Sequence, residues 1–597
     1  MPGRLAVTYN APLADMGFAL KYGTALVPAL ADGFFGDLAM DDVEAVLAEA
    51  GRMAGDIIAP LNRIGDQKGV VFEDGAVTTA PGWKEAYDAW RKGGWNGLAA
   101  PSQWGGQGLP QVLNAACVEM WNAASMAFGV GPLVSMSAID AFSAHGSEPL
   151  KRAYLEKLIS GEWIATMQLT EPHAGSDVGA LRTRAERAGD GTYRIKGQKI
   201  FITYGEHDLT DNIIHFVLAR LPDAPPGTRG ISLFLVPKFL LNADGSPGTR
   251  NDVRAHSVEH KLGIHGSPTC TMIFGDQGGA TGFIIGEENS GMACMFTMMN
   301  RARLAVGLQG VGIAERATQQ ALAYARERRQ GRVAGMPATE AAPIIAHPDV
   351  KRMLLSMRAL TQAARTICYA TALALDHAER GDDQAARQAA HHRASLLTPV
   401  AKAFSTEIGI EVASLGVQVH GGMGFIEETG AAQLLRDARI GPIYEGTNGI
   451  QAIDLVTRKL PLGGGAVVEA YLGELRGIVE AVNATNDPAL GWTGVRLEEA
   501  VECLTRATRW LLARLDKEAD QALAGASPYL RLFGLASGGC LLAQQALAAL
   551  RLGPEAAPRI ALARFFAENY SVQAGAIERV IVEGAPGVLG ADAVLAS

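Results

Sequence analysis

Hydrophobic residues recur at helical spacing in the first part of the chain. Residues 36–60 alternate apolar and acidic positions, as in DDVEAVLAEAGRMAGDII, and the spacing continues over 83–93 and 109–145. This pattern predicts an N-terminal helical domain over 41–162, preceded by an N-terminal arm over 1–40.

The pattern changes near Trp163, where short β-rich runs replace the helical spacing. Examples are TYRIKGQKIFIT, NIIHFVLARL and GISLFLVP, separated by turn clusters such as AGDG and LPDAPPGTRG. Because no helical stretch of about 10–15 residues lies between these runs, a parallel α/β sheet is disfavoured. We expect a middle β-domain over 163–290, built as an antiparallel β-barrel or sandwich.

Helical spacing returns at Gly291 and predicts an antiparallel four-helix bundle over 291–460. The PLGGG segment is interpreted as a linker to an additional C-terminal helical domain over 466–597. The fold class is therefore mainly α with a central β-domain. Individual helices are expected over 346–380, 384–416 and 427–437, from near Glu445 to Leu460, and over 466–484, 494–523, 528–551 and 556–582.

Composition and charge exclude several classes of protein. Of the 597 residues, 48% are hydrophobic and 19% are charged, which excludes general disorder. The net charge of −9 argues against bulk binding to nucleic acid, and the additional C-terminal domain is itself net −4. The six cysteines form no C-x-x-C pair, so we expect buried thiols, no disulfide framework and no metal site.

Two stretches are similar to known functional motifs, but both are interpreted as parts of packed helices. The apolar stretch 533–550 contains Gln544 and small residues, which favours a buried bundle helix over a membrane span. The glycines of GLQGVG (307–312) follow no strand, which favours close helix packing over dinucleotide binding. No long apolar run precedes Asp15, so no signal peptide is predicted and we expect a soluble, cytoplasmic protein.

Two segments far apart in the sequence carry candidate binding chemistry. MQLTEPHAGSDVGALRT (167–183) leaves a strand and enters a turn rich in Gly, Ser and Asp. Its backbone N–H groups suit a phosphate or a flavin edge, and an ordinary Asx/Ser turn is the alternative. In KGQKIFITYGEHDL (196–209), strand alternation places Phe201 and Thr203 on one face. There they either pack in a core or lie against a planar cofactor.

A third segment, QVHGGMGFIEETGAAQLLRDARIGPIYEGTNGIQ (418–451), places a carboxylate at the predicted start of a helix. A glutamate in that position is usually a partner of the helix dipole. Here Gly446 and Gly449 follow Glu445 and leave open space beside it. Glu445 is therefore a candidate catalytic residue.

The motifs TEPHAGSDVG, GQKIFIT, LGIHGSP, QVHGGMGF, LRDAR and IYEGTN occur together and in this order. In this combination, over about 40–460, the chain resembles the acyl-CoA dehydrogenase family. The resemblance implies a helical N-terminal domain, a middle β-domain and a four-helix C-terminal bundle. It also implies FAD-dependent oxidation of an acyl-CoA to its trans-2-enoyl-CoA, with electrons passed to electron-transfer flavoprotein.

The resemblance also implies roles for individual residues. By motif position the catalytic base is Glu445, which removes a proton from Cα while hydride leaves Cβ. A second subunit holds the adenine half of FAD in the family, so a homodimer or higher homo-oligomer is implied. The residues expected to contact FAD are Met167, Leu169, Thr170, Gly175, Ser176, Phe201, Thr203 and Thr447, with Arg328, Gln418 and Gly422 acting on the neighbour's flavin. The expected substrate residues are Ser176, Asn300, Arg303, Tyr444 and Gly446.

The chain departs from the family's pattern at three places. ARERRQGRVAG lacks the family's aromatic flavin contact, and Gln330 is a candidate substitute. Gly449 stands where the family has a glutamine, and His420 stands where an apolar residue is common. Each departure puts one contact in question and leaves Glu445 in place.

The arm and the additional C-terminal domain narrow the resemblance to the long bacterial subgroup that includes 3-methylmercaptopropionyl-CoA dehydrogenase. The expected substrate is a short or medium acyl-CoA, with or without a sulfur atom in its chain. Met295, Met298 and Met299 either adapt to such a chain or belong to the core. The alternatives are an acyl-CoA oxidase that uses O2, and a non-catalytic relative of the fold that binds CoA esters or DNA.

Overall fold

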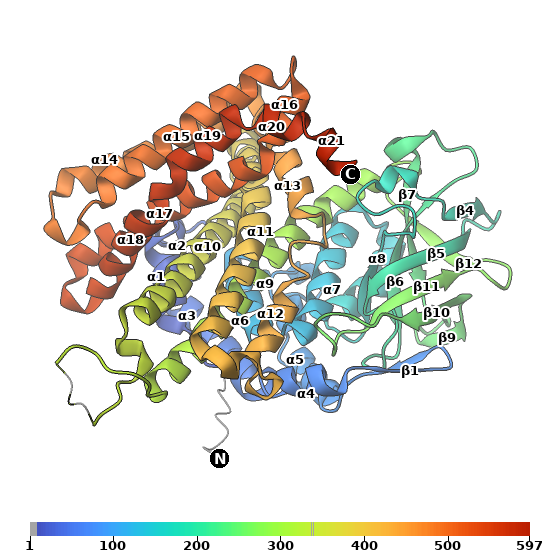
Figure 1. Ribbon diagram of the computed structural model, residues 1–597. Coiled ribbons are helices and arrows are strands. Elements are labelled where there is room, and N and C mark those ends of the chain that lie inside the picture. Colours follow the sequence, from blue (N-terminus) through green and yellow to red (C-terminus); the bar gives the residue numbers. More distant parts are fainter. Residues whose placement is uncertain (1–8, 336, 338, 597) are drawn as a thin grey trace. The chain divides into compact units, whose positions relative to one another are not determined.

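The computed structural model describes residues 9–335, 337 and 339–596, so the first eight residues of the predicted arm lie outside the described part. The described chain forms two compact units, and Figure 1 shows their elements. We call them the bundle unit and the sheet unit. The bundle unit comprises the described residues of Met1–Gly51, Pro110–Ala123 and Arg303–Ser597, and the sheet unit comprises Arg52–Leu109 and Ala124–Ala302.

Three long helices form the centre of the bundle unit (Figure 1). They are α9 (Gly291–Glu327, in this unit from Arg303 on), α10 (Pro348–Arg380) and α11 (Gln384–His420), and α10 packs along α11. The helices α1 and α17 pack against α10. The other helices are α1 (Leu13–Tyr22), α2 (Leu26–Ala31), α3 (Met40–Arg52), α6 (Gln111–Ala124), α12 (Ala431–Ala438), α13 (Asn448–Asp454), α14 (Ala466–Thr485), α15 (Thr493–Arg514), α16 (Ala519–Ala524), α17 (Ala526–Leu552), α18 (Ala557–Asn569), α19 (Ala574–Glu583), α20 (Ala585–Leu589) and α21 (Asp592–Leu595).

Several predicted helices are shorter or divided in the structure. The helix expected over 494–523 ends at Arg514, and α16 starts at Ala519 after a polar turn. The helix expected over 556–582 is divided into α18 and α19 by a 3₁₀ turn at Ser571–Gln573. The helix expected over 427–437 starts only after Gly430, whose φ of +81° ends a preceding turn. Each of these segments is helical, as predicted, but the predicted boundaries of the helices are wrong.

Two glycines of the GLQGVG stretch allow α9 to approach α11 closely. A Cβ atom at Gly307 would lie 2.5 Å from the carbonyl oxygen of Ala401. At Gly310 it would lie 2.3 Å from the carbonyl oxygen of Ser405. Neither position can therefore hold a side chain without moving the α11 backbone. The prediction of helix packing, rather than dinucleotide binding, is confirmed.

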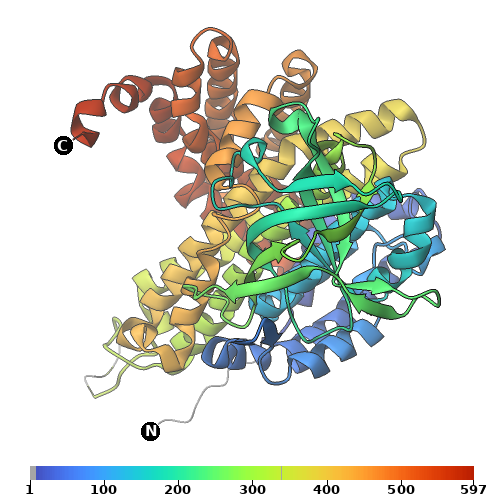
Figure 2. The ribbon, with the colours of Figure 1, turned by 90° about the vertical axis from the view of Figure 1, so that its right-hand side faces the viewer.

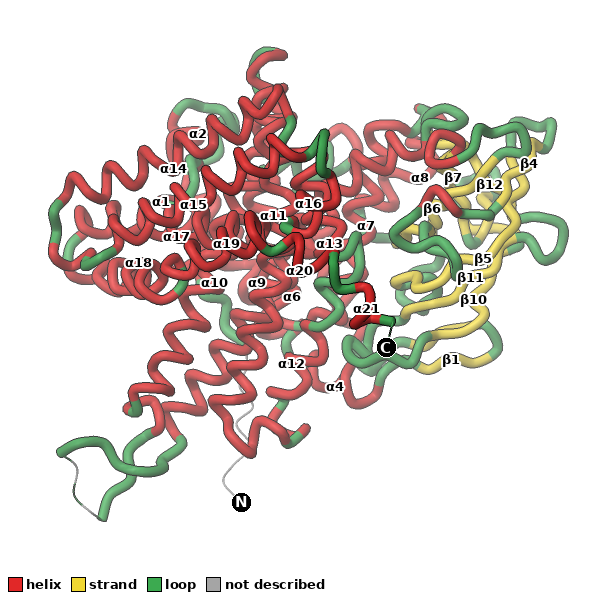
Figure 3. Tube along the Cα trace, turned by 45° about the horizontal axis from the view of Figure 1, so that its top comes forward, coloured by secondary structure: helices red, strands yellow, loops and turns green. Residues whose placement is uncertain are grey.

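The sheet unit combines an eight-stranded sheet with helices, and its strands face the viewer in Figure 2 and are yellow in Figure 3. The sheet contains β3 (Ile164–Gln168), β4 (Arg184–Arg187), β5 (Tyr193–Thr203), β6 (Ile213–Arg220), β7 (Ile231–Pro237), β10 (Val253–Val258), β11 (Thr269–Phe274) and β12 (Ala280–Ile285). Smaller pairs are β1 (Val71–Glu73) with β2 (Ala76–Thr78), and β8 (Phe239–Leu241) with β9 (Pro247–Arg250). The helices of this unit are α4 (Leu61–Lys68), α5 (Trp83–Lys92), α7 (Met126–His145) and α8 (Glu148–Ile159).

The sheet is mainly antiparallel, as predicted, but one edge is parallel. Its strands follow the order β10-β11-β5-β12-β7-β6-β3, and β4 pairs with both β5 and β6. The pairing of β3 with β6 is parallel from Ile164–Ile213 to Gln168–Val217. The two strands can pair in this direction because the chain between them returns through β4 and β5. The predicted antiparallel pairing therefore holds for the sheet except where β6 pairs in parallel with β3 and, at one residue pair, with β4.

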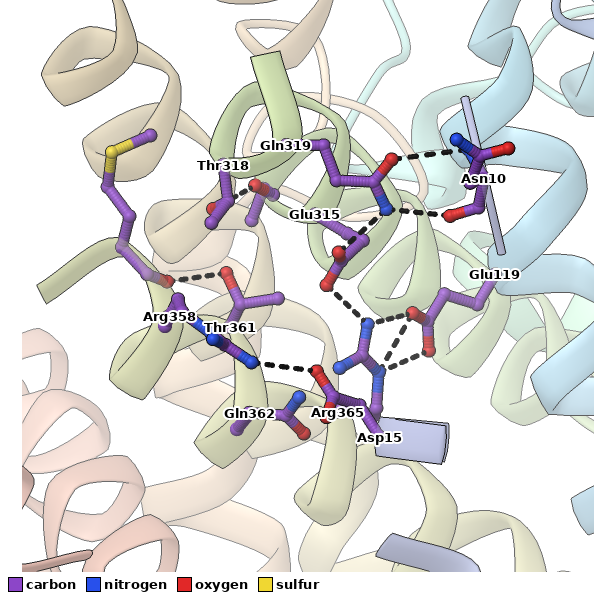
Figure 4. Close-up of polar contacts among 12 residues, drawn as sticks. Asn10, Asp15, Glu119, Glu315, Thr318, Gln319, Arg358, Thr361, Gln362 and Arg365 are labelled. Atoms are coloured by element: carbon purple, nitrogen blue, oxygen red, sulfur yellow. Dashed lines mark hydrogen bonds and ion pairs between the residues drawn. The ribbon is translucent and has the colours of Figure 1, made fainter. Parts of the chain in front are cut away.

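A cluster of buried charges lies in the core of the bundle unit (Figure 4). Arg365 on α10 donates hydrogen bonds from Nε and Nη2 to Glu119 on α6, at 2.9 and 2.6 Å. The same Nη2 donates to Glu315 on α9 at 2.8 Å. Arg365 and Glu119 are fully buried, and together with Glu315 they link α6, α9 and α10 in a low-dielectric interior.

Within the described residues, two helices, α7 and α17, have the length and composition of a membrane span. In each of them 83% of the most apolar window is buried inside the protein. Such burial is typical of core helices, and it supports the interpretation of 533–550 as a bundle helix. The six cysteines are all buried as free thiols, as expected.

Candidate functional site

The first candidate segment leaves the edge of the sheet at the end of β3. Met167 is buried there, and Leu169 and Thr170 are half-buried. The carbonyl oxygen of Thr170 accepts a hydrogen bond from the backbone N–H of Ile200 on β5, at 2.9 Å. The segment is thus fixed against the strand that carries Phe201.

The turn that follows exposes the predicted phosphate-contacting residues. Gly175 and Ser176 are exposed, and a Cβ atom at Gly175 would meet no other atom within 4 Å. Asp177 accepts a hydrogen bond from the backbone N–H of Gly179 at 3.0 Å and caps a short 3₁₀ turn. The Asx turn therefore exists at Asp177, while the space beside Gly175 leaves room for a ligand.

A buried ion pair holds the segment from Met167 to Ser176 in place. Lys199 Nζ lies 2.8 Å from Glu171 Oε1, and it also donates to the carbonyl oxygen of Leu169 at 3.1 Å. Burial lowers the pKa of Lys199 to about 8, against the opposing charge of Glu171. Burial alone would raise the pKa of Glu171, but Lys199 and the hydrogen bonds from Thr183 and the Arg182 backbone lower it.

The strand β5 contains a bulge at its end. Between two register pairs with β11, β5 has two residues, Ile200 and Phe201, where β11 has one. Phe201 has a φ of +61° and its side chain is 60% exposed, whereas the next residue, Ile202, is buried. Thr203 is half-buried. An exposed aromatic ring on a strained backbone is typical of a ligand-contacting position rather than of a core.

Glu445 lies in a tight turn of the bundle unit, between α12 and α13. Its φ is +54° and that of Gly446 is +84°, so two consecutive residues are left-handed. A helix does begin near Glu445, as predicted, but Glu445 lies outside its first turn, because α13 begins at Asn448, after the left-handed pair has turned the chain. A left-handed residue other than glycine costs about 1–2 kcal/mol, so neighbouring contacts must hold this conformation.

Those contacts converge on the carbonyl oxygen of Gly446. Lys402 Nζ on α11 donates to it at 2.8 Å, and Gln451 Nε2 donates to it at 3.3 Å. Burial raises the pKa of the Glu445 carboxyl above its ordinary value, while the charges of Lys402 and Arg303 lower it. A half-buried carboxyl with a raised pKa is well suited to accept a proton near neutral pH.

The predicted substrate residues Arg303 and Asn300 fall in different units. Arg303 is buried near Glu445, and its Nη1 lies 3.2 Å from Asp454 Oδ2. Asn300 belongs to the sheet unit and is half-buried. Met295 and Met298 are almost completely buried, so they belong to the packed core of that unit rather than to an open acyl site.

Tyr444 and Thr447 use their hydroxyl groups within the protein. The Tyr444 hydroxyl donates to Gln309 Oε1, and Gln309 in turn donates to Asn122 at 3.0 Å. Thr447 is the N-cap of α13, and its hydroxyl oxygen accepts a hydrogen bond from the backbone N–H of Ile450 at 3.2 Å. Both residues therefore fix the two sides of the Glu445 turn.

The three residues expected to act on a neighbouring flavin lie near the ends of α9 and α11. The ring of Tyr324 on α9 stacks on His420, the last residue of α11, with centroids 4.5 Å apart. This contact places Arg328, which follows α9, at the same end of the bundle unit as Gln418 and Gly422. All three are exposed, and a Cβ atom at Gly422 would meet no atom within 4 Å. The departure at His420 is thus accommodated by stacking.

The structure therefore groups the predicted residues other than Asn300 into three sets. One set lies in the sheet unit, at the β3 end and the β5 bulge. A second surrounds Glu445, and a third lies at the α9 and α11 ends. The first set comprises Met167, Leu169, Thr170, Gly175, Ser176, Phe201 and Thr203, the second Glu445, Arg303, Tyr444, Gly446 and Thr447, and the third Arg328, Gln418 and Gly422.

Comparison with known proteins decides the family. The chain matches the models for the acyl-CoA dehydrogenase N-terminal domain over 41–162, middle domain over 166–277 and C-terminal domain over 289–460. It also matches the acetyl-CoA dehydrogenase C-terminal-like model over 471–592. It is 48% identical to 3-methylmercaptopropionyl-CoA dehydrogenase of Ruegeria pomeroyi, over 96% of this chain and 97% of that protein.

The chain belongs to the acyl-CoA dehydrogenase family. This dehydrogenase is also 36% identical to a butyryl-CoA dehydrogenase of Syntrophomonas wolfei, over 82% of each chain. A solved acyl-CoA dehydrogenase of Bacillus anthracis, complexed with FAD, shares its fold with a TM-score of 0.74 at 22% identity, over 91% of this chain and 88% of that one.

Acyl-CoA dehydrogenases depend on FAD, and the residues of this dehydrogenase fit that cofactor. In the sheet unit, the open space beside Gly175 allows a phosphate-bearing ligand to approach the backbone. The exposed ring of Phe201 offers a flat apolar surface. The enzyme is therefore an FAD-dependent acyl-CoA dehydrogenase.

Sequence reasoning assigned no role to the two buried lysines of the dehydrogenase, Lys199 and Lys402. Both lysines are 0% exposed. Lys199 donates to the backbone carbonyl of Leu169, and Lys402 donates to that of Gly446. A signal was present for Lys402, because it is the one charged residue in the apolar run LLTPVAKAF. A lone charge on an apolar helix face indicates a buried partner.

Proposed function

We propose that this dehydrogenase oxidises linear short or medium acyl-CoA thioesters, including 3-methylmercaptopropionyl-CoA, and passes the electrons to electron-transfer flavoprotein. The observation that supports the substrate is the 48% identity, over nearly the whole chain, to an enzyme named for 3-methylmercaptopropionyl-CoA. The similarity to a butyryl-CoA dehydrogenase supports a short linear chain as well. The substrate class is therefore proposed as linear rather than branched or aromatic.

Glu445 is the proposed general base. Its carboxylate removes the proton from Cα of the thioester, and its raised pKa brings it closer to the pH of the reaction. The α-proton of a thioester is a weak acid, so negative charge on the carbonyl oxygen must be stabilised as it develops. The resemblance assigns part of this task to the backbone N–H of Glu445, whose position the turn fixes.

When bound, FAD accepts the hydride that leaves Cβ, so that the Cα–Cβ bond becomes a double bond. The residues proposed to hold it are those of the sheet unit, from the Met167 segment to the Phe201 bulge. Lys199 and Glu171 would keep that segment in place. The two electrons would pass to electron-transfer flavoprotein, and the proton taken from Cα and the one carried with the hydride would be released, which balances the reaction.

The enzyme is proposed to act as a homo-oligomer in the cytoplasm. Beside Gly422, three apolar side chains are exposed, Met423 (49%), Phe425 (87%) and Ile426 (44%). An exposed apolar patch next to the residues expected to act on a neighbour's flavin supports contact with a second copy at this end. Six free thiols are consistent with a reducing compartment.

A substrate panel tests the proposed function. We would measure kcat/KM of the purified holoenzyme for butyryl-, hexanoyl-, octanoyl-, palmitoyl-, isovaleryl- and 3-methylmercaptopropionyl-CoA, with electron-transfer flavoprotein as acceptor. Because one methylene changes discrimination by about 1–3 kcal/mol, the values should form a graded series with a maximum at the short linear esters. A maximum at palmitoyl-CoA, or activity with isovaleryl-CoA alone, would overturn the substrate assignment.

The same assay separates a dehydrogenase from an oxidase. With O2 as the only acceptor, turnover and hydrogen peroxide formation should be slow compared with turnover on electron-transfer flavoprotein. Rapid stoichiometric peroxide formation in air would instead assign O2 as the acceptor.

A further inference from the structure

We propose that Lys402 is a positioning residue for the reaction: its buried ammonium holds the carbonyl oxygen of Gly446 and thereby fixes the turn that carries Glu445. This inference rests on the proposed role of Glu445 as the base.

The ammonium group of Lys402 binds the residues that follow Glu445. Lys402 is fully buried in the middle of α11. Its Nζ donates to the Gly446 carbonyl at 2.8 Å and to Asn448 Oδ1 at 2.9 Å. Two of its three hydrogens therefore bind one short stretch of chain, on either side of Thr447.

The turn needs such a partner because its backbone is strained. Glu445 and Gly446 both have positive φ values, and residues other than glycine hold that conformation only when their surroundings impose it. The carbonyl of Gly446 points into the protein, where Lys402 and Gln451 supply its two hydrogen bonds. Loss of the shorter bond would free the peptide between Gly446 and Thr447 to rotate, and with it the turn that carries Glu445.

Asn448 extends the arrangement to a second carboxyl. Its Oδ1 accepts from Lys402, and its Nδ2 donates to Glu407 Oε1 at 3.3 Å. The amide is thus held at both ends, which fixes the start of α13 in the same orientation as the turn. Lys402 is therefore the central member of a chain of contacts rather than an isolated charge.

The charges around Lys402 determine the expected pH dependence. The groups that face it are Glu445 from the turn, Arg303 from α9 and Glu407 from α11, with Arg531 of α17 acting on Glu407. The pKa of Lys402 is lowered to about 7, because burial and the charge of Arg303 outweigh the opposing carboxylates of Glu445 and Glu407. The positive charge of Lys402 lowers the pKa of Glu445, so removal of this charge should raise that pKa. Arg303 is paired with Asp454 and does not replace the missing charge.

The test compares Lys402→Met, Lys402→Arg and the exposed control Lys351→Met on α10 as FAD-loaded enzymes. For each we would measure kcat, KM, the pH profile of kcat with butyryl-CoA, and the affinity for a non-oxidisable butyl-CoA thioether. We expect Lys402→Met to lower kcat by about tenfold or more, with thioether affinity within about threefold of wild type. The acidic limb of its profile should move up by about one pH unit, and Lys402→Arg should restore the limb.

A kcat and an acidic limb of Lys402→Met that match those of Lys351→Met would overturn the proposal. If Lys402→Met does not bind FAD, Lys402→Gln takes its place with the same two criteria. Glu445→Gln, measured alongside, separates the two proposals. An active Glu445→Gln variant refutes the base, whereas an inactive one together with a normal Lys402→Met variant refutes only the role of Lys402.

Discussion

The guanidinium of Arg365 lies 2.6 Å from the carboxylate of Glu119, and neither side chain is exposed to solvent. Removing Glu119 takes away the carboxylate that accepts from both Nε and Nη2 of Arg365 and leaves this buried guanidinium with Glu315 as its remaining carboxylate partner. We therefore expect Glu119→Ala to lower the free energy of unfolding by about 3–5 kcal/mol, measured by urea denaturation of the holoenzyme.

The matched control for this variant is Asp349→Ala, which removes an ion pair with Arg352 on the surface of α10. Because exposed pairs contribute about 0–1 kcal/mol, the control should unfold almost as wild type. Equal unfolding midpoints for the two variants would show that the buried cluster does not stabilise the bundle.

The pair of Lys199 with Glu171 should determine how well the enzyme retains FAD. Lys199→Met removes the hydrogen bond to Leu169 and leaves Glu171 buried without its charge partner. We expect a loss of FAD on gel filtration and a raised Kd. The double variant Lys199→Met with Glu171→Gln should recover stability, since no lone charge remains, but not full FAD affinity. Normal FAD affinity in both variants would contradict the anchoring role.

The stability of the bundle unit should depend on the titration of Asp376. Burial raises the pKa of this carboxyl to about 7, although it accepts hydrogen bonds from the backbone N–H groups of Gln111 and Val112. Because the folded pKa exceeds the unfolded value of about 3.9, its contribution to stability is lost as pH rises from about 4 to about 7.

Asp376→Asn removes this titration while keeping an acceptor for the two N–H groups. The stability of the variant relative to wild type should therefore rise with pH, by about 1.4 kcal/mol for each unit up to about pH 7. Unfolding midpoints at pH 5 and pH 8 measure the difference. A constant difference between variant and wild type would show that Asp376 does not titrate in this range.

Periodicity and turn composition predict the type of most elements here, because helical and strand spacing are local properties of the sequence. The ends of helices were harder to predict where no glycine or proline marks them. The break after Arg514 lies in a charged stretch, and the one at Tyr570 lies next to an aromatic contact with Phe566. Neither break contains a glycine or a proline, so local spacing alone could not place them.

In the candidate site too, some features could be predicted from the sequence and others could not. Its motif residues could be located from the resemblance, but the left-handed backbone of Glu445 and the bulge at Phe201 depend on long-range pairing. The contact of Lys402 with Gly446 joins residues 44 positions apart in the sequence. Only the fold reveals that a lysine in an apolar helix reaches the turn of the candidate base.

The exposed side chain of Phe425 should be needed for assembly. If the apolar patch at Met423, Phe425 and Ile426 meets a second copy, Phe425→Asp places a charge in that contact and should shift the enzyme toward monomers. FAD content should fall with it, because ligand binding and assembly are linked. Analytical ultracentrifugation checks this outcome, with Leu552→Asp, also at an exposed apolar position, as the control. An unchanged oligomer would place the interface elsewhere.

The measurement that tests the central claim most directly is anaerobic reduction of the bound flavin in Glu445→Gln by butyryl-CoA. The amide keeps the shape of the side chain but cannot accept the Cα proton, and a general base contributes about 10²–10⁴-fold to the rate. We expect the variant to retain FAD and to bind the thioester, while the rate at which the flavin absorption bleaches falls by at least about 10²-fold. Bleaching at more than a tenth of the wild-type rate would show that Glu445 is not the base.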